Sequence, residues 1–207
     1  DEAKIEQGAF CHDIHFLDIP SDQTKFDRYL LALKSVVTQA PYTINWLRSD
    51  EYRSAIKRLL AANKYDLVHF DTISLLPYFE LVCDIPTVLD HHNIESHMLT
   101  RRAKNEKNAL KKWYYKQEGL RLHNYEKEYC PKFTLNITCS EIDAERLRDI
   151  SPDCQASEIA NGVDIDYFKA DEDIEQGSSI IFVGTLSWYP NIEAVRFMAY
   201  ELWPALK

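Results

Sequence analysis

The sequence predicts an α/β fold in which a doubly wound parallel sheet carries helices on both faces. Short apolar runs of strand length alternate with stretches of helical periodicity, and no tight hairpin turn joins two of the runs. Parallel strands need such long crossovers, whereas antiparallel strands are joined by short turns. The runs predicted as strands are residues 66–70, 86–90, 133–139 and 180–183, with a more polar fifth run at 14–19.

Helical patterns fill the intervals between these runs. Residues 50–63 place apolar side chains at amphipathic spacing, which predicts a surface helix. Ser140 and Asp143 form a capping box, which predicts a helix from this point to about Ile150. The other predicted helices are residues 94–129, with a break near Gly119, and the stretch after Pro190.

A change in composition and periodicity after residue 160 predicts a domain boundary. Asn161-Gly162 is a turn signal, and the segment Asp171 to Gly177 is acidic and poorly periodic. We therefore expect a first domain over residues 1–160, a linker over 161–178, and the start of a second domain over 179–207. One strand and one helix cannot bury both faces of a sheet, so we expect this second domain to be incomplete.

Composition excludes several classes of protein. The chain has 207 residues, 45% of them hydrophobic and 28% charged, which is typical of a globular protein. Its net charge of −9 argues against a general nucleic-acid binder. No apolar stretch is long enough to span a bilayer, and no signal-like segment opens the sequence. The five cysteines form no C-x-x-C pair, which favours reduced, mostly buried thiols in a cytoplasmic protein.

The ends of the predicted strands carry the reactive side chains. In open parallel sheets, ligands bind beyond the carboxyl ends of the strands. Asp71 follows the first run, Gly184 follows the last, and the sequence Asp90 to Glu95 (D-H-H-N-I-E) lies between a strand and a helix. Imidazole and carboxylate groups exchange protons and bind hydroxyl groups, and a helix N-terminus attracts anions.

A purely structural alternative for this segment remains open. His91 and His92 would then hydrogen-bond loop carbonyls, and Asn93 would cap the following helix. A metal site in this segment is disfavoured, because the rings of two adjacent histidines point apart. None of the five glycines forms the G-x-G-x-x-G or Walker pattern, so neither a nicotinamide dehydrogenase nor a P-loop NTPase is supported. No G-x-S-x-G elbow indicates an α/β-hydrolase.

Residues 100–132 are strongly basic and aromatic. They carry ten Lys or Arg against four Glu, with Trp113 and four tyrosines interleaved. Basic side chains beside aromatic rings are attracted to anionic membrane surfaces. The alternative is a solvated helix whose aromatic rings pack inward.

Four motifs in order resemble those of retaining glycosyltransferases with the GT-B fold, family 4 or "group 1" type. Asp90 to Ser96 resembles the stretch D-E-H-N-x-E-S, and Ser140 to Leu147 is similar to S-x-x-D-x-x-x-L. Asn161 to Phe168 is similar to the interdomain signature N-G-V-D-x-x-x-F. Phe182 to Asn191 resembles the opening of the nucleotide-binding domain.

The resemblance implies two Rossmann-like domains, the first binding mainly the acceptor and the second mainly the nucleotide sugar. His92 matches the family's strand-end histidine near the transferred sugar, and it is the expected catalytic residue. Substrate-binding roles are then expected for Asp71, Asp90, Asn93 and Glu95, and donor-binding roles for Gly184 and Asn191. Such enzymes usually need no metal or other cofactor, since basic side chains and a helix dipole stabilise the leaving diphosphate.

The resemblance also has gaps that keep other functions open. The family's glycine-rich first loop, its downstream pair of glutamates and the basic residues of its donor site are not in these 207 residues. We therefore expect this chain alone to be inactive in transfer, and the full-length protein to move a sugar to a glycan or lipid-linked acceptor in polysaccharide biosynthesis. We expect it in the cytoplasm, at the inner face of the membrane. The alternative function is a non-catalytic GT-B-like binding or scaffolding protein, and a Rossmann oxidoreductase is a third.

Overall fold

A computed structural model describes residues 8, 10–38, 40–169 and 179–206 of the chain. The chain divides into two compact units, residues 1–162 and 163–207. The predicted linker over 161–178 therefore belongs mostly to the second unit, and its acidic part, Asp171 to Gly177, lies outside the described residues.

The first unit is built on a four-stranded parallel sheet with the strand order β1-β2-β3-β4. Phe70 pairs with Leu89, Leu89 with Asn136, and Asn136 with Ala156, so the register runs straight across the sheet. Three of the predicted strands are therefore confirmed. The strands are β1 (Val68–Phe70), β2 (Thr87–His91), β3 (Leu135–Thr138) and β4 (Ala156–Glu158).

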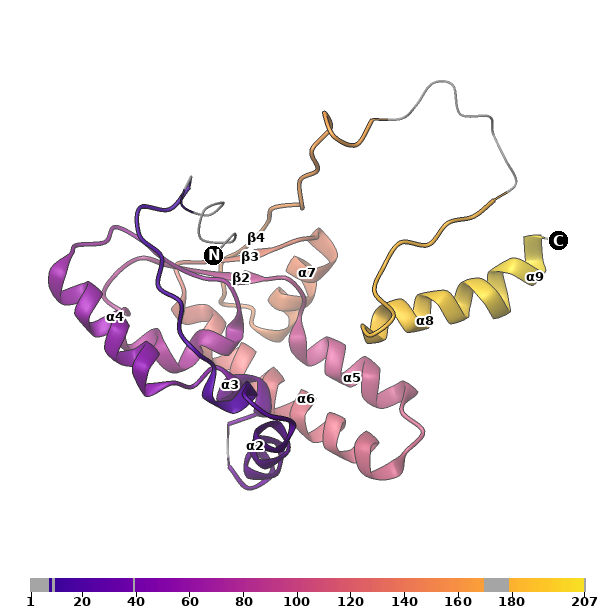
Figure 1. Ribbon diagram of the computed structural model, residues 1–207, viewed down its shortest axis with the longest axis horizontal. Coiled ribbons are helices and arrows are strands. Elements are labelled where there is room, and N and C mark those ends of the chain that lie inside the picture. Colours follow the sequence, from indigo (N-terminus) through magenta and orange to yellow (C-terminus); the bar gives the residue numbers. More distant parts are fainter. Residues whose placement is uncertain (1–7, 9, 39, 170–178, 207) are drawn as a thin grey trace. The chain divides into compact units, whose positions relative to one another are not determined.

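Helices and short helical turns flank this sheet and supply its crossovers. In Figure 1, α3, α5 and α6 lie on one side of the strands. The helices predicted over 50–63 and from Ser140 to Ile150 are confirmed. The helical elements of the first unit are η1 (Pro20–Asp22), α2 (Lys25–Val37), α3 (Tyr42–Trp46), α4 (Asp50–Ala62), η2 (Ile73–Leu81), α5 (Glu95–Asn105), α6 (Ala109–Tyr129), η3 (Cys130–Lys132) and α7 (Glu141–Ile150).

The main core lies between the sheet and these helices. Leu89 of β2 and Leu122 of α6 are fully buried, and Ile44 of α3 joins the same cluster. Burying one such aliphatic side chain stabilises the fold by about 1.5–3 kcal/mol. On the opposite face of the sheet, His69 is exposed and Asp90 is half-buried, so this face is more polar.

The long helix predicted over 94–129 is interrupted, but not at Gly119. Glu106 ends α5, and the Asn108 side chain accepts the Lys111 N–H to start α6. Gly119 lies inside α6, where an added Cβ would be 3.1 Å from Thr100 Oγ1 and 3.4 Å from the Ser96 carbonyl oxygen. Glycine at this position therefore allows the two helices to pack closely, and it does not break α6.

Two predicted strands are wrong. Residues 14–19 and 180–183 form neither helix nor strand. A β-strand exists only through hydrogen bonds to a neighbour, and no other strand lies within described residues 179–206. In the second unit the helix predicted after Pro190 is confirmed. It comprises α8 (Tyr189–Phe197), the π-helical turn η4 (Met198–Leu202) and α9 (Trp203–Leu206).

The cysteines are all free thiols, but fewer are buried than expected. Cys130 and Cys154 are buried, Cys139 is half-buried, and Cys11 and Cys83 are exposed. Within the described part of the chain, no helix combines the length and apolar character that a membrane span requires.

Candidate functional site

The candidate site lies at the carboxyl edge of the parallel sheet, where three neighbouring strands end. Asp71 follows β1, His92 follows β2, and Cys139 follows β3. Because the strands are parallel and adjacent, their last residues reach the same edge. Asp90, the penultimate residue of β2, completes a cluster of carboxylate, imidazole and thiol groups.

His92 and Asp71 form a hydrogen-bonded pair across this edge. The His92 Nε2 atom lies 3.2 Å from Asp71 Oδ1, and both side chains are more than half exposed. An ionised carboxylate only accepts hydrogen bonds, so Nε2 carries the proton and donates it. The bond orients the ring and leaves Nδ1 available to a ligand.

The two carboxylate oxygens of Asp90 have different surroundings. Its Oδ2 lies 3.8 Å from Nε2 of His69, a residue of β1. Its Oδ1 is buried and has no hydrogen-bond partner among the described residues. A buried carboxylate oxygen without a donor costs free energy, so this atom is suited to a ligand that brings positive charge or a donor.

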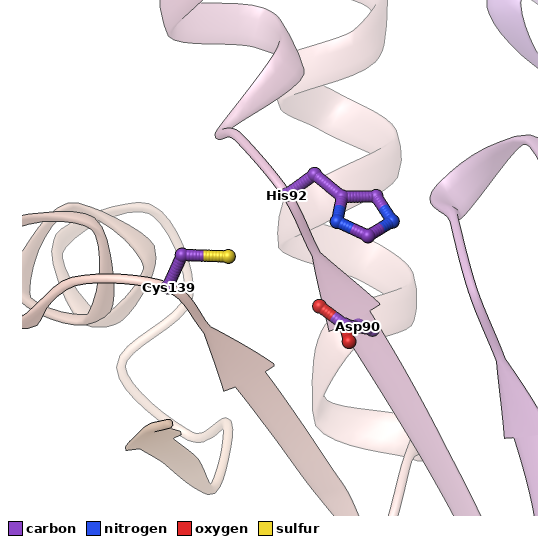
Figure 2. A group of neighbouring side chains, drawn as sticks. All are labelled: Asp90, His92 and Cys139. Atoms are coloured by element: carbon purple, nitrogen blue, oxygen red, sulfur yellow. The ribbon is translucent and has the colours of Figure 1, made fainter. Parts of the chain in front are cut away.

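Figure 2 shows the Cys139 sulfur and the Asp90 carboxylate on the same side of the His92 ring. One ligating atom from each of these three residues lies within 4.8 Å of the other two. The cluster thus combines a soft sulfur, an imidazole nitrogen and a carboxylate oxygen on the ends of two rigid strands.

His91 faces the opposite way and is part of the core. Its Nε2 lies 3.1 Å from Asn136 Oδ1, while Asn136 Nδ2 donates to the carbonyl oxygens of Cys130 and Gln155. These two bonds fix the amide orientation, so the His91 ring must be the donor to Oδ1. Burial lowers the pKa of His91, which keeps the ring neutral.

The structural alternative for His91 and His92 is therefore half right. His91 is structural, although it bonds a side chain and no loop carbonyl, and His92 is exposed in the cluster. Asn93 does not cap the following helix, because the N-cap residue of α5 is Ile94, without a side-chain hydrogen bond. Asn93 is instead exposed in the turn between β2 and α5.

A buried carboxylate from α6 holds the start of α5 instead. Glu126 accepts the Ser96 N–H through Oε1 at 3.0 Å and the Ser96 hydroxyl through Oε2. Burial raises the pKa of Glu126 to about 7, although the two hydrogen bonds oppose this shift. Burial also raises the pKa of Glu95, the first residue of α5, and the nearby His92 partly offsets it.

Gly184 and Asn191 form a local contact in the second unit. The Asn191 side chain donates to the Thr185 carbonyl at 3.0 Å. A Cβ added to Gly184 would lie 2.8 Å from Asn191 Nδ2, so a larger residue would displace this amide. The contact explains why glycine and asparagine suit these positions, and their donor-binding role stays a prediction.

Sequence reasoning missed Cys139, a member of the cluster, and His69, which lies beside Asp90. Cys139 is the last residue of the strand predicted over 133–139, so the rule that selected Asp71 and Asp90 could have selected it too. His69 lies within β1 and points to the same sheet face as Asp90, which only the strand register reveals.

The four-stranded parallel sheet and its flanking helices define a domain of the Rossmann-like α/β class. Residues 6–167 match the family model described as Glycosyltransferase Family 4. Because this match covers more than half of the chain, the chain belongs to that family, with the GT-B-type N-terminal domain as its fold. It is thus a glycosyltransferase domain. No curated protein and no solved structure matches the chain.

Proposed function

We propose that this chain supplies the acceptor-side part of a retaining glycosyltransferase that uses a nucleotide sugar. The full-length protein would move a hexosyl group to a glycan or lipid-linked acceptor, in polysaccharide biosynthesis. The observation that carries the proposal is the exposed His92–Asp71 pair at the carboxyl edge of the sheet. An oriented imidazole there can hydrogen-bond a hydroxyl group of the sugar during transfer.

The surrounding charges suit the chemistry of glycosyl transfer. The transition state of such reactions has oxocarbenium-ion character, so positive charge develops on the sugar ring. Asp71, Asp90 and Glu95 place carboxyl groups near His92, and an ionised carboxylate stabilises such a charge. For the leaving diphosphate, we propose that the region of Gly184 and Asn191 allows close backbone approach. We expect transfer to need no metal or other cofactor.

The test is a donor panel applied to the full-length protein. It is incubated with UDP-, GDP- and ADP-hexoses singly, with and without candidate acceptors, and nucleoside diphosphate release is measured. We expect release with one donor class, and an anomeric proton signal in the product that shows retained configuration. Donor binding without release from any donor, with any acceptor, would instead support a non-catalytic binding protein.

We also propose that an anionic membrane surface is a partner of this domain. At the start of α6, Leu110 and Trp113 are exposed among basic residues, whereas Tyr125 and Tyr129 pack against the core. Arg121 of α6 donates to the Val36 carbonyl at 2.9 Å, which holds α2 beside α6. Helix α2 adds exposed apolar side chains at helical spacing, namely Phe26, Tyr29, Leu30, Leu33 and Val37.

Binding to vesicles tests this partner directly. We expect binding to vesicles with anionic lipids that weakens as salt rises, because each basic side chain contributes about 1 kcal/mol at such a surface. Replacing exposed Lys111 and Lys112 with Glu should weaken binding at least tenfold. The matched control reverses exposed Lys57 and Arg58 on α4, which should change little. Equal binding to neutral and anionic vesicles would contradict the proposal.

A further inference from the structure

The cluster at the sheet edge has the donor set of a transition-metal site. Asp90, His92 and Cys139 each direct one ligating atom toward the others, and all three atoms lie within 4.8 Å of one another (Figure 2). Thiolate and imidazole together select zinc over magnesium or calcium, which prefer oxygen ligands. Three protein ligands with a fourth position open is a common zinc arrangement.

A second observation concerns Asp90 alone. Its Oδ1 atom is buried, although a quarter of the side chain is exposed, and no described residue donates a hydrogen bond to it. Backbone and side-chain donors satisfy nearly all such buried oxygens in folded proteins. A bound cation would satisfy this oxygen through direct coordination.

The surroundings of His92 also suit a metal ligand. Ligating histidines usually donate their second ring N–H to a carboxylate, which fixes the tautomer and makes the ring a better ligand. Asp71 accepts from His92 Nε2 at 3.2 Å, so in the neutral ring the remaining nitrogen, Nδ1, is the one that can coordinate a metal.

We propose that Asp90, His92 and Cys139 form a binding site for a zinc ion. Zinc ligands lie about 2.0–2.3 Å from the metal, so tetrahedral neighbours are roughly 3.3–3.8 Å apart. The three atoms must therefore approach one another by about 1.5 Å at most. His92 is exposed and Cys139 is half-buried, so neither side chain is locked in the core against this approach.

The proposed site does not use His91 and His92 together as ligands. His91 is buried against Asn136 and faces away from His92, so the two rings do not act together. The third ligand comes instead from Cys139, on the neighbouring strand. If the proposed role of His92 in transfer is correct, zinc bound here occupies that residue and inhibits the reaction.

Cobalt spectroscopy tests the site, because Co²⁺ replaces zinc and shows a thiolate charge-transfer band. The starting protein carries Cys11→Ser and Cys83→Ser, which remove the two exposed thiols and leave Cys139 as the accessible one. We expect a saturable band for one Co²⁺ per chain, and its loss when Zn²⁺ is added. Adding Cys139→Ser should abolish the band, and His92→Ala or Asp90→Asn should each weaken Zn²⁺ binding by tenfold or more.

Two controls make the outcome decisive. His97→Ala removes an exposed histidine that lies five residues after His92, and it should leave Zn²⁺ affinity unchanged. Far-ultraviolet circular dichroism shows that each variant is folded. The proposal is overturned if the starting protein shows no band, or if the band survives Cys139→Ser. It is equally overturned if only the cysteine matters, since a lone thiol is no site. These measurements use no sugar donor, so their outcome is independent of the proposed transfer activity.

Discussion

We expect replacement of His92 with alanine to lower the rate of sugar transfer by about two to four orders of magnitude, the range typical of a lost proton-transfer or charge-stabilising group. The side chain is 57% exposed and hydrogen-bonds the exposed Asp71, so the fold should tolerate the change. The measurement is nucleoside diphosphate release at saturating donor, made on the full-length protein. The temperature of unfolding should stay within about a degree or two of the wild-type value, since exposed substitutions cost little.

Two further variants test whether the effect is specific to the His92–Asp71 pair. Asp71→Asn keeps the size of the side chain but weakens its hold on the His92 ring, so we expect a loss of about tenfold. His15→Ala removes an exposed histidine that pairs with Asp13 before α2, and it should leave the rate unchanged. If His92→Ala transfers sugar at the wild-type rate, His92 has no part in the mechanism.

The stability of the domain falls as pH rises from about 4.5 to 7, because of Glu126. Burial raises the pKa of this carboxyl from 4.5 in an exposed chain to about 7 in the folded protein. Between these values the folded state holds a proton that the unfolded state has lost, so stability decreases with rising pH. The decrease from this group amounts to about 3 kcal/mol by neutral pH, at 1.36 kcal/mol for each unit of pKa difference.

Urea unfolding at several pH values measures this decrease. Burial also raises the pKa of Glu95 and of Glu118, so these two carboxyl groups add to the same trend. Glu126→Gln keeps an acceptor for the Ser96 N–H and removes the titrating group, so its stability should fall less over this interval. Glu128→Gln, an exposed substitution two residues further on, is the matched control. Identical pH profiles for wild type and Glu126→Gln would contradict the assignment.

Much of the first unit could be predicted because its strands are buried and apolar. Phe70 and Leu89 are buried in short, largely apolar runs, which are typical of parallel sheets. Strand β4 could not be predicted, because Ala156, Ser157 and Glu158 form no such run and the strand exists through its pairing with β3. Residues 180–183 were wrongly predicted as a strand. They have a strand-like composition but pair with no neighbouring strand within the described residues.

The candidate site was predictable as a position but not as a set of contacts. The strand-end rule located Asp71, Asp90 and His92, since it depends only on where each strand ends. Which of two adjacent histidines faces the core depends on the pleat of β2, and Asn136 across the sheet decides it for His91. The contribution of Cys139 depends on β2 and β3 being neighbours, which no local pattern reveals.

The packing of α5 against α6 should also determine which part of the domain unfolds together. Gly119 lets the helices approach closely, and Glu126 of α6 holds the first turn of α5 through Ser96. Because these contacts join the two helices, we expect the helices to unfold as one cooperative unit. Their amide hydrogens would then exchange with solvent at a common rate. His92 precedes α5 by three residues, so the same opening would disassemble the cluster at the sheet edge.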